Sequence, residues 1–298
     1  MDANTFPSAH DAIAWAVRRR NIPIIERSSV HAMGKKKAVF EWMPGLDAWE
    51  KLAEAVYIFI TMLRKLLSDQ QPDLVAAAFD LKGPTFRHEL SADYKAHRRP
   101  MPDDPVEQVS WVHEACAALG VPIVSHAGFE ADDVIGTLAT QATAAGVDVV
   151  VVTGDKDFFQ LVGDRIRVFN PRDEGAWYDD AGVLEKFGVR PDQVVDVLAL
   201  MGDASDNVSG VPGVGKKGAI DLITTYGSLD ALLERAGELT QKKYRETLLA
   251  HRAEALRSRE LVTIRRDVPL DFEFESLRYQ GASRERCYEL FSRLAFRS

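Results

Sequence analysis

The chain has 298 residues, of which 46% are hydrophobic and 28% are charged, as expected for a globular protein with one large domain or two moderate ones. The formal net charge is −8 at pH 7, which argues against a generally basic nucleic-acid-binding surface. Cys116 and Cys287 match no metal-binding or disulfide spacing, no apolar run is long enough to span a membrane, and no signal-peptide pattern opens the chain. We therefore expect a cytoplasmic protein with no membrane partner.

Strands and helices are expected to alternate through the middle of the chain. The clearest strand is the nearly all β-branched run at 147–152, and Gly120 and Gly146 each follow a helical pattern and mark its end. This alternation predicts a parallel sheet in an α/β domain, with Asp80 and Asp155 at the carboxyl ends of strands, where open α/β sheets place their sites. The expected elements, in chain order, are a strand at 74–79, a helix at 105–119, a strand at 121–124, a helix at 132–145 and strands at 147–152 and 165–169.

From about residue 180 the pattern changes to helices joined by glycine-rich turns. Residues 194–201 and 216–226 are expected to be helical, with a tight loop at 210–215 between them. Residues 229–260 add at least two amphipathic helices rich in Arg, Lys and Glu. The second half of the chain is therefore expected to be a helical domain.

Three acidic clusters lie between residues 130 and 206, and each adjoins a different expected element. Each cluster alone could simply be a helix N-terminus, a turn or a helix cap. The presence of all three, together with Asp80, favours a shared site. Carboxylates brought together repel one another unless cations neutralise them, and an all-oxygen site suits Mg²⁺ or Mn²⁺. Two such ions about 4 Å apart clamp the attacking and leaving oxygens in phosphodiester hydrolysis, so the first hypothesis is a metal-dependent nuclease. The clusters are Glu130-Ala-Asp132-Asp133, Asp155-Lys-Asp157 and Asp203-Ala-Ser-Asp206.

The loop from Gly210 to Lys217 follows the third acidic cluster and reads Gly-Val-Pro-Gly-Val-Gly-Lys-Lys. Gly213 and Gly215 would let backbone N–H groups approach a phosphate, and the next helix offers its positive N-terminus with Lys216. Such a helix-hairpin-helix turn grips the DNA backbone without reading sequence. Alone, the loop would more often be a plain turn.

A local basic stretch lies between residues 82 and 99, diluted by Glu89 and Asp93. A solvated helix face would look the same. The functional interpretation is a segment that guides nucleic acid, with cations on phosphates and Tyr94 stacking on a base.

In order along the chain, these motifs resemble the 5′-nucleases. That family includes the 5′→3′ exonuclease domain of bacterial DNA polymerase I, stand-alone bacterial exonucleases and flap endonucleases. The resemblance extends from about Val56 to Phe296. Its motifs are Phe79-Asp80, Gly83-Pro-Thr-Phe-Arg87-His-Glu, Tyr94-Lys95-x-x-Arg98, Gly128-Phe-Glu130-Ala-Asp132-Asp133, Thr153-Gly-Asp155-Lys-Asp157, Leu200-Met-Gly-Asp203-x-Ser-Asp206-Asn and Gly210-Val-Pro-Gly-Val-Gly215.

The resemblance implies a role for each of these residues. Lys95 and Arg98 would lie in a helical arch that the 5′ end threads, where they contact the scissile phosphate, and Tyr94 and Arg87 are assigned to the catalytic residues with them. The hairpin loop, with Gly213, Gly215, Lys216 and Lys217, would bind duplex DNA and a K⁺ ion. Two Mg²⁺ or Mn²⁺ ions would be held, one by Asp80, Glu130, Asp132 and Asp133 and the other by Asp155, Asp157, Asp203 and Asp206.

The resemblance also implies the domain organisation. Residues 56–185 would form an α/β, parallel-sheet (PIN-like) nuclease domain, with the helical arch near 82–105. Residues 186–298 would form a helical DNA-binding domain, with the helix-hairpin-helix motif near 208–226. Residues 1–55 form a divergent N-terminal segment. No polymerase domain is expected.

The chain departs from the family at its N-terminus. The family opens with an apolar strand ending in a metal-binding aspartate, in a pattern like Ile-Asp-Gly-Ser-Ser. The nearest counterpart here is Ile24-Ile25-Glu26-Arg27-Ser28-Ser29, in which Glu26 replaces the aspartate and becomes a candidate ligand. Alternatively residues 1–50 are an unrelated extension and the sheet lacks its first strand.

The leading hypothesis is a monomeric 5′→3′ exonuclease and 5′ flap endonuclease acting on flaps, nicks or gaps in DNA during replication and repair. The first alternative is a degenerate relative that holds branched DNA without cutting it efficiently, because the first-strand aspartate is replaced. The second is a ribonuclease of similar α/β architecture, which the hairpin loop and helical domain disfavour because such ribonucleases need neither.

Overall fold

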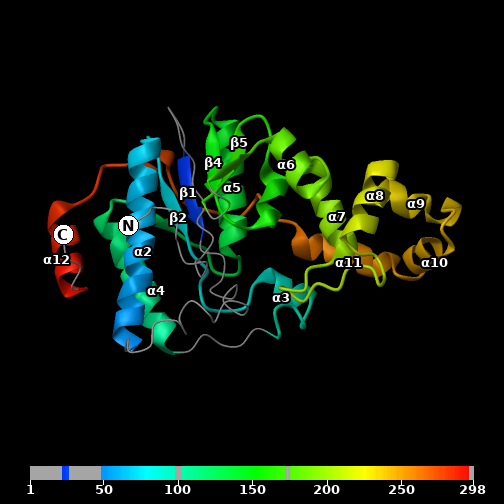
Figure 1. The fold of residues 1–298 in the computed structure, drawn as a ribbon, viewed down its shortest axis with the longest axis horizontal. Helices are drawn as coiled ribbons and strands as arrows, with labels where there is room; N and C mark the ends of the chain where they lie inside the picture. Colours follow the sequence, from blue (N-terminus) through cyan, green and yellow to red (C-terminus); the bar gives the residue numbers. More distant parts are fainter. Residues whose placement is uncertain (1–21, 27–47, 98–102, 172, 174, 295–298) are drawn as a thin grey trace.

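The computed structural model describes residues 22–26, 48–97, 103–171, 173 and 175–294, and its longest axis runs from the sheet and its helices to a helical end (Figure 1). Among these residues six strands form one sheet in the order β3-β2-β1-β4-β5-β6. All neighbouring strands are parallel except the β5–β6 pair, which is antiparallel. The strands are β1 (Ile22–Glu26), β2 (Ala76–Ala78), β3 (Ile123–Val124), β4 (Val149–Val152), β5 (Ile166–Asn170) and β6 (Ala176–Tyr178).

The strand β1 occupies the centre of the sheet, between β2 and β4, with Glu26 in register with Ala78 and Ile25 with Val152. The N-terminal segment therefore supplies a central strand, as one of the two readings of Ile24–Glu26 requires. The predicted strands at 74–79, 121–124, 147–152 and 165–169 are confirmed, most of them shorter than expected. The antiparallel edge strand β6 was not expected.

Each face of the sheet is covered by helices. On one face pack α2 (Ala48–Gln70), α4 (Asp103–Ala118) and α12 (Arg284–Arg293), and on the other lies α5 (Ala131–Ala144) (Figure 1). The proposed division at residue 55 falls inside α2. The helices predicted at 105–119 and 132–145 are confirmed as α4 and α5.

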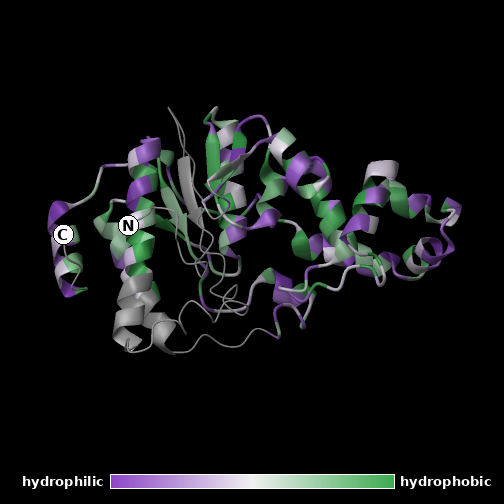
Figure 2. Ribbon diagram, in the orientation of Figure 1, coloured by the Kyte–Doolittle hydropathy of each residue, from purple (hydrophilic) through white to green (hydrophobic). Residues whose placement is uncertain are grey.

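The buried valines of β4 show why the sheet is covered on both faces. Val149 and Val151 join the core under α5, whereas Val150 and Val152 join the core under α2 and α4. Successive side chains of a strand point to opposite faces, so a continuous β-branched run suits a strand buried on both. Figure 2 shows apolar residues along β2 and β4 and more polar ones on outer helices such as α12.

The second half of the chain is helical, as predicted. It follows α6 (Asp180–Phe187) and consists of α7 (Val194–Met201), α8 (Lys216–Tyr226), α9 (Leu229–Glu234), α10 (Lys242–Ala250) and α11 (Arg252–Val262). The short helix α3 (Phe86–Leu90) and four 3₁₀ turns complete the described elements, the turns being η2 (Lys156–Leu161), η3 (Pro191–Gln193), η4 (Ala236–Glu238) and η5 (Phe274–Leu277).

After α11 the chain returns to the half that contains the sheet. Gln160 holds this returning segment by donating to the carbonyl oxygen of Val262 over 3.0 Å and accepting from the backbone N–H of Ile264 over 2.9 Å. Further on, Val75 N–H donates to the carbonyl oxygen of Leu277 over 2.8 Å. The two halves are therefore packed against each other and are not joined only by a flexible linker. No helix in the described ranges combines the length and apolar character needed to cross a membrane.

Candidate active site

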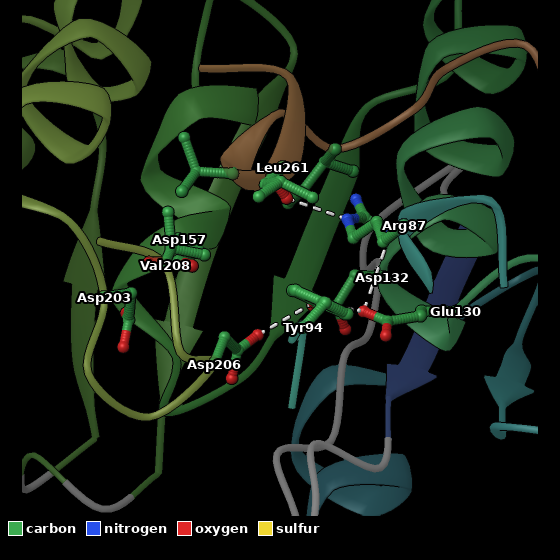
Figure 3. Close-up of a pocket in the computed structure, with 11 residues that line it drawn as sticks. Arg87, Tyr94, Glu130, Asp132, Asp157, Asp203, Asp206, Val208 and Leu261 are labelled. Carbon is green, nitrogen blue, oxygen red and sulfur yellow. Dashed lines mark hydrogen bonds and ion pairs between the residues drawn. The ribbon is translucent and has the colours of Figure 1, made fainter. Parts of the chain in front are cut away.

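A pocket opens where the loops after the parallel strands meet the start of the helical half (Figure 3). Five carboxylates line it, and they come from three separate stretches of chain: the start of α5, the turn η2 after β4, and the loop between α7 and α8. Sequence spacing predicted this convergence from the carboxyl ends of strands. The five are Glu130, Asp132, Asp157, Asp203 and Asp206.

Local hydrogen bonds fix the segments that carry these carboxylates. Asp155 caps η2, since its Oδ1 accepts from the backbone N–H of Asp157 over 2.9 Å. Asp80, just after β2, accepts from the N–H of Ala131 at the start of α5 over 2.7 Å. The α7–α8 loop folds on itself because Asp203 and Val208 exchange two backbone hydrogen bonds of 2.9 and 2.8 Å. Asp80 and Asp155 thus position lining residues, and neither lines the pocket itself.

Tyr94 and Lys95 lie between two of the carboxylates. The Tyr94 hydroxyl is 3.1 Å from Oε2 of Glu130 and 3.0 Å from Oδ2 of Asp206, so it bridges the start of α5 and the α7–α8 loop. Lys95 Nζ lies 2.7 Å from Oε1 of Glu130 and 3.5 Å from Oδ2 of Asp206. The Tyr94 side chain is only 2% exposed, so in this arrangement its ring is not accessible for the predicted stacking on a base.

Lys156 makes a similar bridge on the other side of the pocket. Its Nζ lies 2.7 Å from Oδ2 of Asp203 and 3.1 Å from Oδ1 of Asp157. Lys156 had no predicted role, although it stands between Asp155 and Asp157 in the chain. A cation flanked by two acids in one motif was the available signal.

The pKa values of the pocket carboxylates shift in opposite directions. Burial raises the pKa of Asp157 well above its ordinary value, and repulsion from Asp155 adds to this effect. Burial also raises the pKa of Asp155. Burial alone would raise the pKa of Glu130, but the positive charges of Lys95 and Arg87 outweigh this effect and lower the pKa. The pocket therefore has one electrostatically satisfied side, at Glu130, and one with excess negative charge, at Asp157 next to the buried Asp155.

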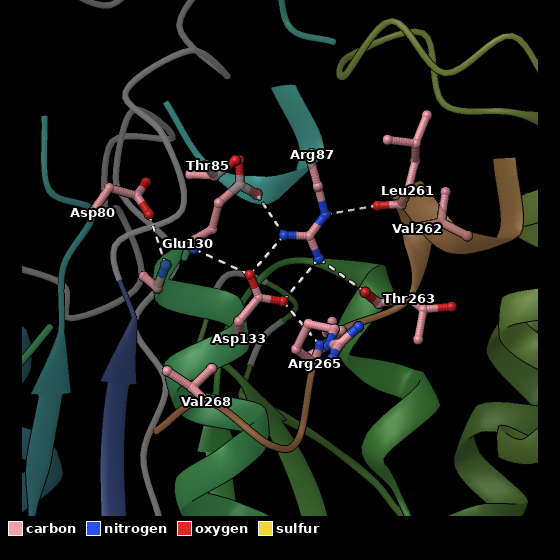
Figure 4. A network of polar contacts seen from close by, with 12 residues as sticks. Asp80, Thr85, Arg87, Glu130, Asp133, Leu261, Val262, Thr263, Arg265 and Val268 are labelled. Carbon is pink, nitrogen blue, oxygen red and sulfur yellow. Dashed lines mark hydrogen bonds and ion pairs between the residues drawn. The ribbon is translucent and has the colours of Figure 1, made fainter. Parts of the chain in front are cut away.

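Arg87, which lines the pocket, forms a buried pair with Asp133, which does not (Figure 4). Nη1 of Arg87 donates to Oδ2 of Asp133 over 2.6 Å and Nη2 donates to Oδ1 over 2.8 Å. Arg87 is 3% exposed and Asp133 is fully buried. Asp133 does not line the pocket, and both its oxygens already accept hydrogen bonds. Its predicted role as a direct metal ligand has no support in this geometry.

The donor set of the pocket suits a hard divalent cation, because it offers carboxylate oxygens and no thiolate or imidazole. Within the part of the chain that the structure describes, however, no three His, Cys, Asp or Glu side chains stand close enough together to hold an ion. The lysines explain this, since Lys95 and Lys156 each lie between two carboxylates. The carboxylates are therefore of the right chemical type to bind a metal ion, but the ammonium groups of Lys95 and Lys156 now lie between them.

Two predicted site residues cannot be judged from side chains. Arg98 lies outside the described residues. For Glu26 the backbone alone is described: it ends β1, beside Ala78 of β2, two residues before Asp80. This places Glu26 at the same edge of the sheet as the acidic pocket.

The predicted hairpin loop joins α7 to α8. Gly213 has a left-handed backbone with φ of +78°, which a side chain would strain, and Gly215 precedes the first turn of α8. Lys216 and Lys217 are exposed there. Lys243 of α10 also lies beside the loop, because a Cβ on Gly213 would meet its Cε at 3.1 Å. Lys243 is far from the loop in the sequence, so no motif could have predicted that it lies there.

Two family models match the chain in succession. Residues 47–188 match the 5′-3′ exonuclease N-terminal resolvase-like domain, and residues 189–285 match the 5′-3′ exonuclease C-terminal SAM fold. The chain belongs to the 5′-3′ exonuclease family. Both of the family's domains are present in their expected order, and the first match begins after β1.

Relatives agree with this assignment, and a solved structure has a similar fold. DNA polymerase I of Mycobacterium leprae is 45% identical over 246 residues, which cover 82% of this chain and 27% of that protein. DNA polymerase I of Bacillus caldotenax is 40% identical over 248 residues, with 82% and 28% covered. The chain thus spans about a quarter of these relatives. The fold resembles the T5 5′-exonuclease solved with zinc ions, with a TM-score of 0.64 at 19% identity over 80% of this chain and 90% of that one.

Proposed function

We propose that this protein is a metal-dependent 5′→3′ exonuclease and structure-specific 5′ flap endonuclease that hydrolyses DNA phosphodiester bonds in replication and repair. The observation that carries the proposal is the pocket in which carboxylates from three separate segments converge next to the hairpin loop. Membership of the 5′-3′ exonuclease family supports it. Relatives named DNA polymerase I give the setting in replication and repair.

The pocket would hold two Mg²⁺ or Mn²⁺ ions. Glu130 and Asp132, with Asp80 behind them, would hold one, and Asp157, Asp203 and Asp206, supported by Asp155, would hold the other. When bound, such ions activate the attacking water and stabilise charge on the leaving oxygen. Lys95 and Lys156 would then have to give up at least one carboxylate partner each. A released Lys95, with Arg98, would neutralise the scissile phosphate.

The hairpin loop would grip the duplex. Backbone N–H groups around Gly213 and Gly215 and the exposed ammonium groups of Lys216 and Lys217 suit phosphate oxygens. Lys243 adds a further cation to the same surface. A K⁺ ion at this loop is part of the proposal, as are action as a monomer and a cytoplasmic location.

The proposed reaction is tested with a 5′-labelled flap duplex, a nicked duplex and a single strand. Cleavage near the base of the flap is expected with Mg²⁺ or Mn²⁺ and not with EDTA, because the carboxylates need cations to act. Retained binding of the flap duplex in EDTA, without any cleavage in either metal, would refute nuclease activity and support the alternative below.

Replacing Lys216 and Lys217 by Ala should weaken binding to all duplexes similarly. Each phosphate contact contributes about one unit to the slope of log affinity against log salt, so the slope should become shallower by about two. Binding is measured by fluorescence anisotropy at several salt concentrations, with Lys65→Ala as control because Lys65 lies exposed on α2. An unchanged slope would mean that the loop is only a turn.

The second candidate is a binding protein that holds branched DNA without efficient cleavage. The observation that favours it is Glu26, where the family pattern places an aspartate, at the end of the central strand β1. A longer side chain displaces its carboxylate from the position that an aspartate would reach. The flap assay separates the two candidates.

A further inference from the structure

We propose that Arg87 and Asp133 are positioning residues that set Glu130 for cation binding, without contacting metal or DNA themselves. This inference rests on the proposed function. In this role Arg87 is not a direct catalytic residue and Asp133 is not a metal ligand, unlike the roles predicted for them from the sequence.

The guanidinium of Arg87 joins three separate parts of the fold (Figure 4). From α3 it donates to Asp133 on α5, and its Nε and Nη2 donate to the carbonyl oxygens of Leu261 and Thr263 over 2.8 and 2.9 Å. Leu261 lies in the last turn of α11 and Thr263 just after it. One buried side chain thus connects the segment leading to Tyr94 and Lys95, the helix that begins at Glu130, and the end of the helical half.

Asp133 connects Arg87 to Glu130 through hydrogen bonds. Its Oδ2 accepts from the backbone N–H of Glu130 over 3.1 Å and its Oδ1 accepts from the N–H of Arg265 over 2.8 Å. Nη1 of Arg87 also lies 3.6 Å from Oε2 of Glu130. Glu130 is therefore fixed at its backbone by Asp133 and held at its carboxylate by Arg87.

The packing around the pair leaves little room for alternatives. Gly136 lies one turn after Asp133 on α5, and a Cβ there would come within 2.6 Å of the carbonyl oxygen of Arg265. Val268 N–H donates to the Thr137 hydroxyl over 3.0 Å. The segment after α11 thus packs tightly against the first two turns of α5. A buried ion pair with all its partners in place fixes geometry, and removal of one partner leaves an uncompensated charge.

Four variants test the inference: Arg87→Met, Arg87→Lys, Asp133→Asn and the double variant Arg87→Met with Asp133→Asn. Mn²⁺ binding is measured without DNA, from the electron paramagnetic resonance of free Mn²⁺. Each single variant should lose about 10–100-fold in Mn²⁺ affinity, as found for residues that orient metal ligands. The double variant should lose no more than the worse single variant, because the pair acts as a unit. Arg87→Lys, which keeps the charge, should recover part of the loss.

Flap cleavage supplies a second measurement. At saturating Mn²⁺ the kcat of the variants should approach the wild-type value, because positioning of Glu130 affects how much metal is bound. A low kcat in Arg87→Met at saturating Mn²⁺, with unchanged Mn²⁺ affinity, would place Arg87 on the phosphate and overturn the inference. A loss of Mn²⁺ affinity in Asp133→Asn but not in Arg87→Met would make Asp133 a ligand and also overturn it.

The control is the exposed pair Arg190 and Asp192, joined over 2.9 Å, whose variants Arg190→Met and Asp192→Asn should leave Mn²⁺ affinity unchanged. If Arg87→Met does not fold, Arg87→Lys and Asp133→Asn carry the test, and wild-type Mn²⁺ affinity in both refutes the inference. A wild-type protein that binds Mn²⁺ but cuts no flap refutes the proposed function alone, since the affinities still test the pair.

Discussion

Asp157→Asn should reduce flap cleavage at least about 10²–10³-fold in Mg²⁺, since a bound metal ion contributes several kcal/mol to the transition state. Asp157 lines the pocket at the start of η2. Burial and repulsion from Asp155 and Asp203 raise its pKa, so a bound cation would stabilise its charged form. The measurement is single-turnover cleavage of a labelled 5′ flap, with Asp148→Asn as control because Asp148 is an exposed carboxylate in the same half of the protein. Wild-type cleavage by Asp157→Asn would remove this residue from the mechanism.

The same variant should fold and be more stable than wild type in EDTA. Burial and nearby carboxylates raise the pKa of Asp157, so the folded protein keeps a proton that the unfolded chain loses. This contribution to stability is present below the unfolded pKa of about 4 and is lost as the pH rises towards the raised pKa. Asn carries no such proton. The difference in Tm should therefore appear at neutral pH and shrink below pH of about 4, which separates loss of a ligand from loss of the fold.

Glu26→Ala should also lower cleavage by about two orders of magnitude, provided that Glu26 stands in for the aspartate of the family's first strand. The strand β1 brings it to the same edge as Asp80, in register with Ala78 of β2. Glu26→Asp should instead match or exceed wild type, because a shorter carboxylate on this strand reproduces the family pattern. Cleavage is measured over a range of Mn²⁺ concentrations for both variants.

Thermal unfolding provides the control for Glu26. A small change in Tm together with a large loss of cleavage indicates a ligand. A large fall in Tm indicates damage to the central strand. Equal cleavage by wild type, Glu26→Asp and Glu26→Ala would exclude Glu26 from the reaction and leave the binding-only candidate dependent on other residues.

Much of the fold was predictable because its signals are local. The β-branched run around Val150 predicts a strand buried on both faces, and the glycines beside Lys216 predict the turn before α8. The first two acidic clusters could be assigned to one pocket because they follow β3 and β4, which end at the same edge of the parallel sheet. These predictions needed only periodicity, turn chemistry and the parallel order of strands.

The partners of the charged side chains could not be predicted in this way. The sequence by itself determined that carboxylates converge, but only the tertiary structure decided that Asp133 faces Arg87, that Tyr94 is buried against Glu130, and that Lys156 lies between Asp157 and Asp203. It also decided that Ile22–Glu26, before the first family match, is the central strand. The reason is that these contacts join residues far apart in the chain, and the balance of burial against pairing that selects them exists only once the helices and sheet have packed.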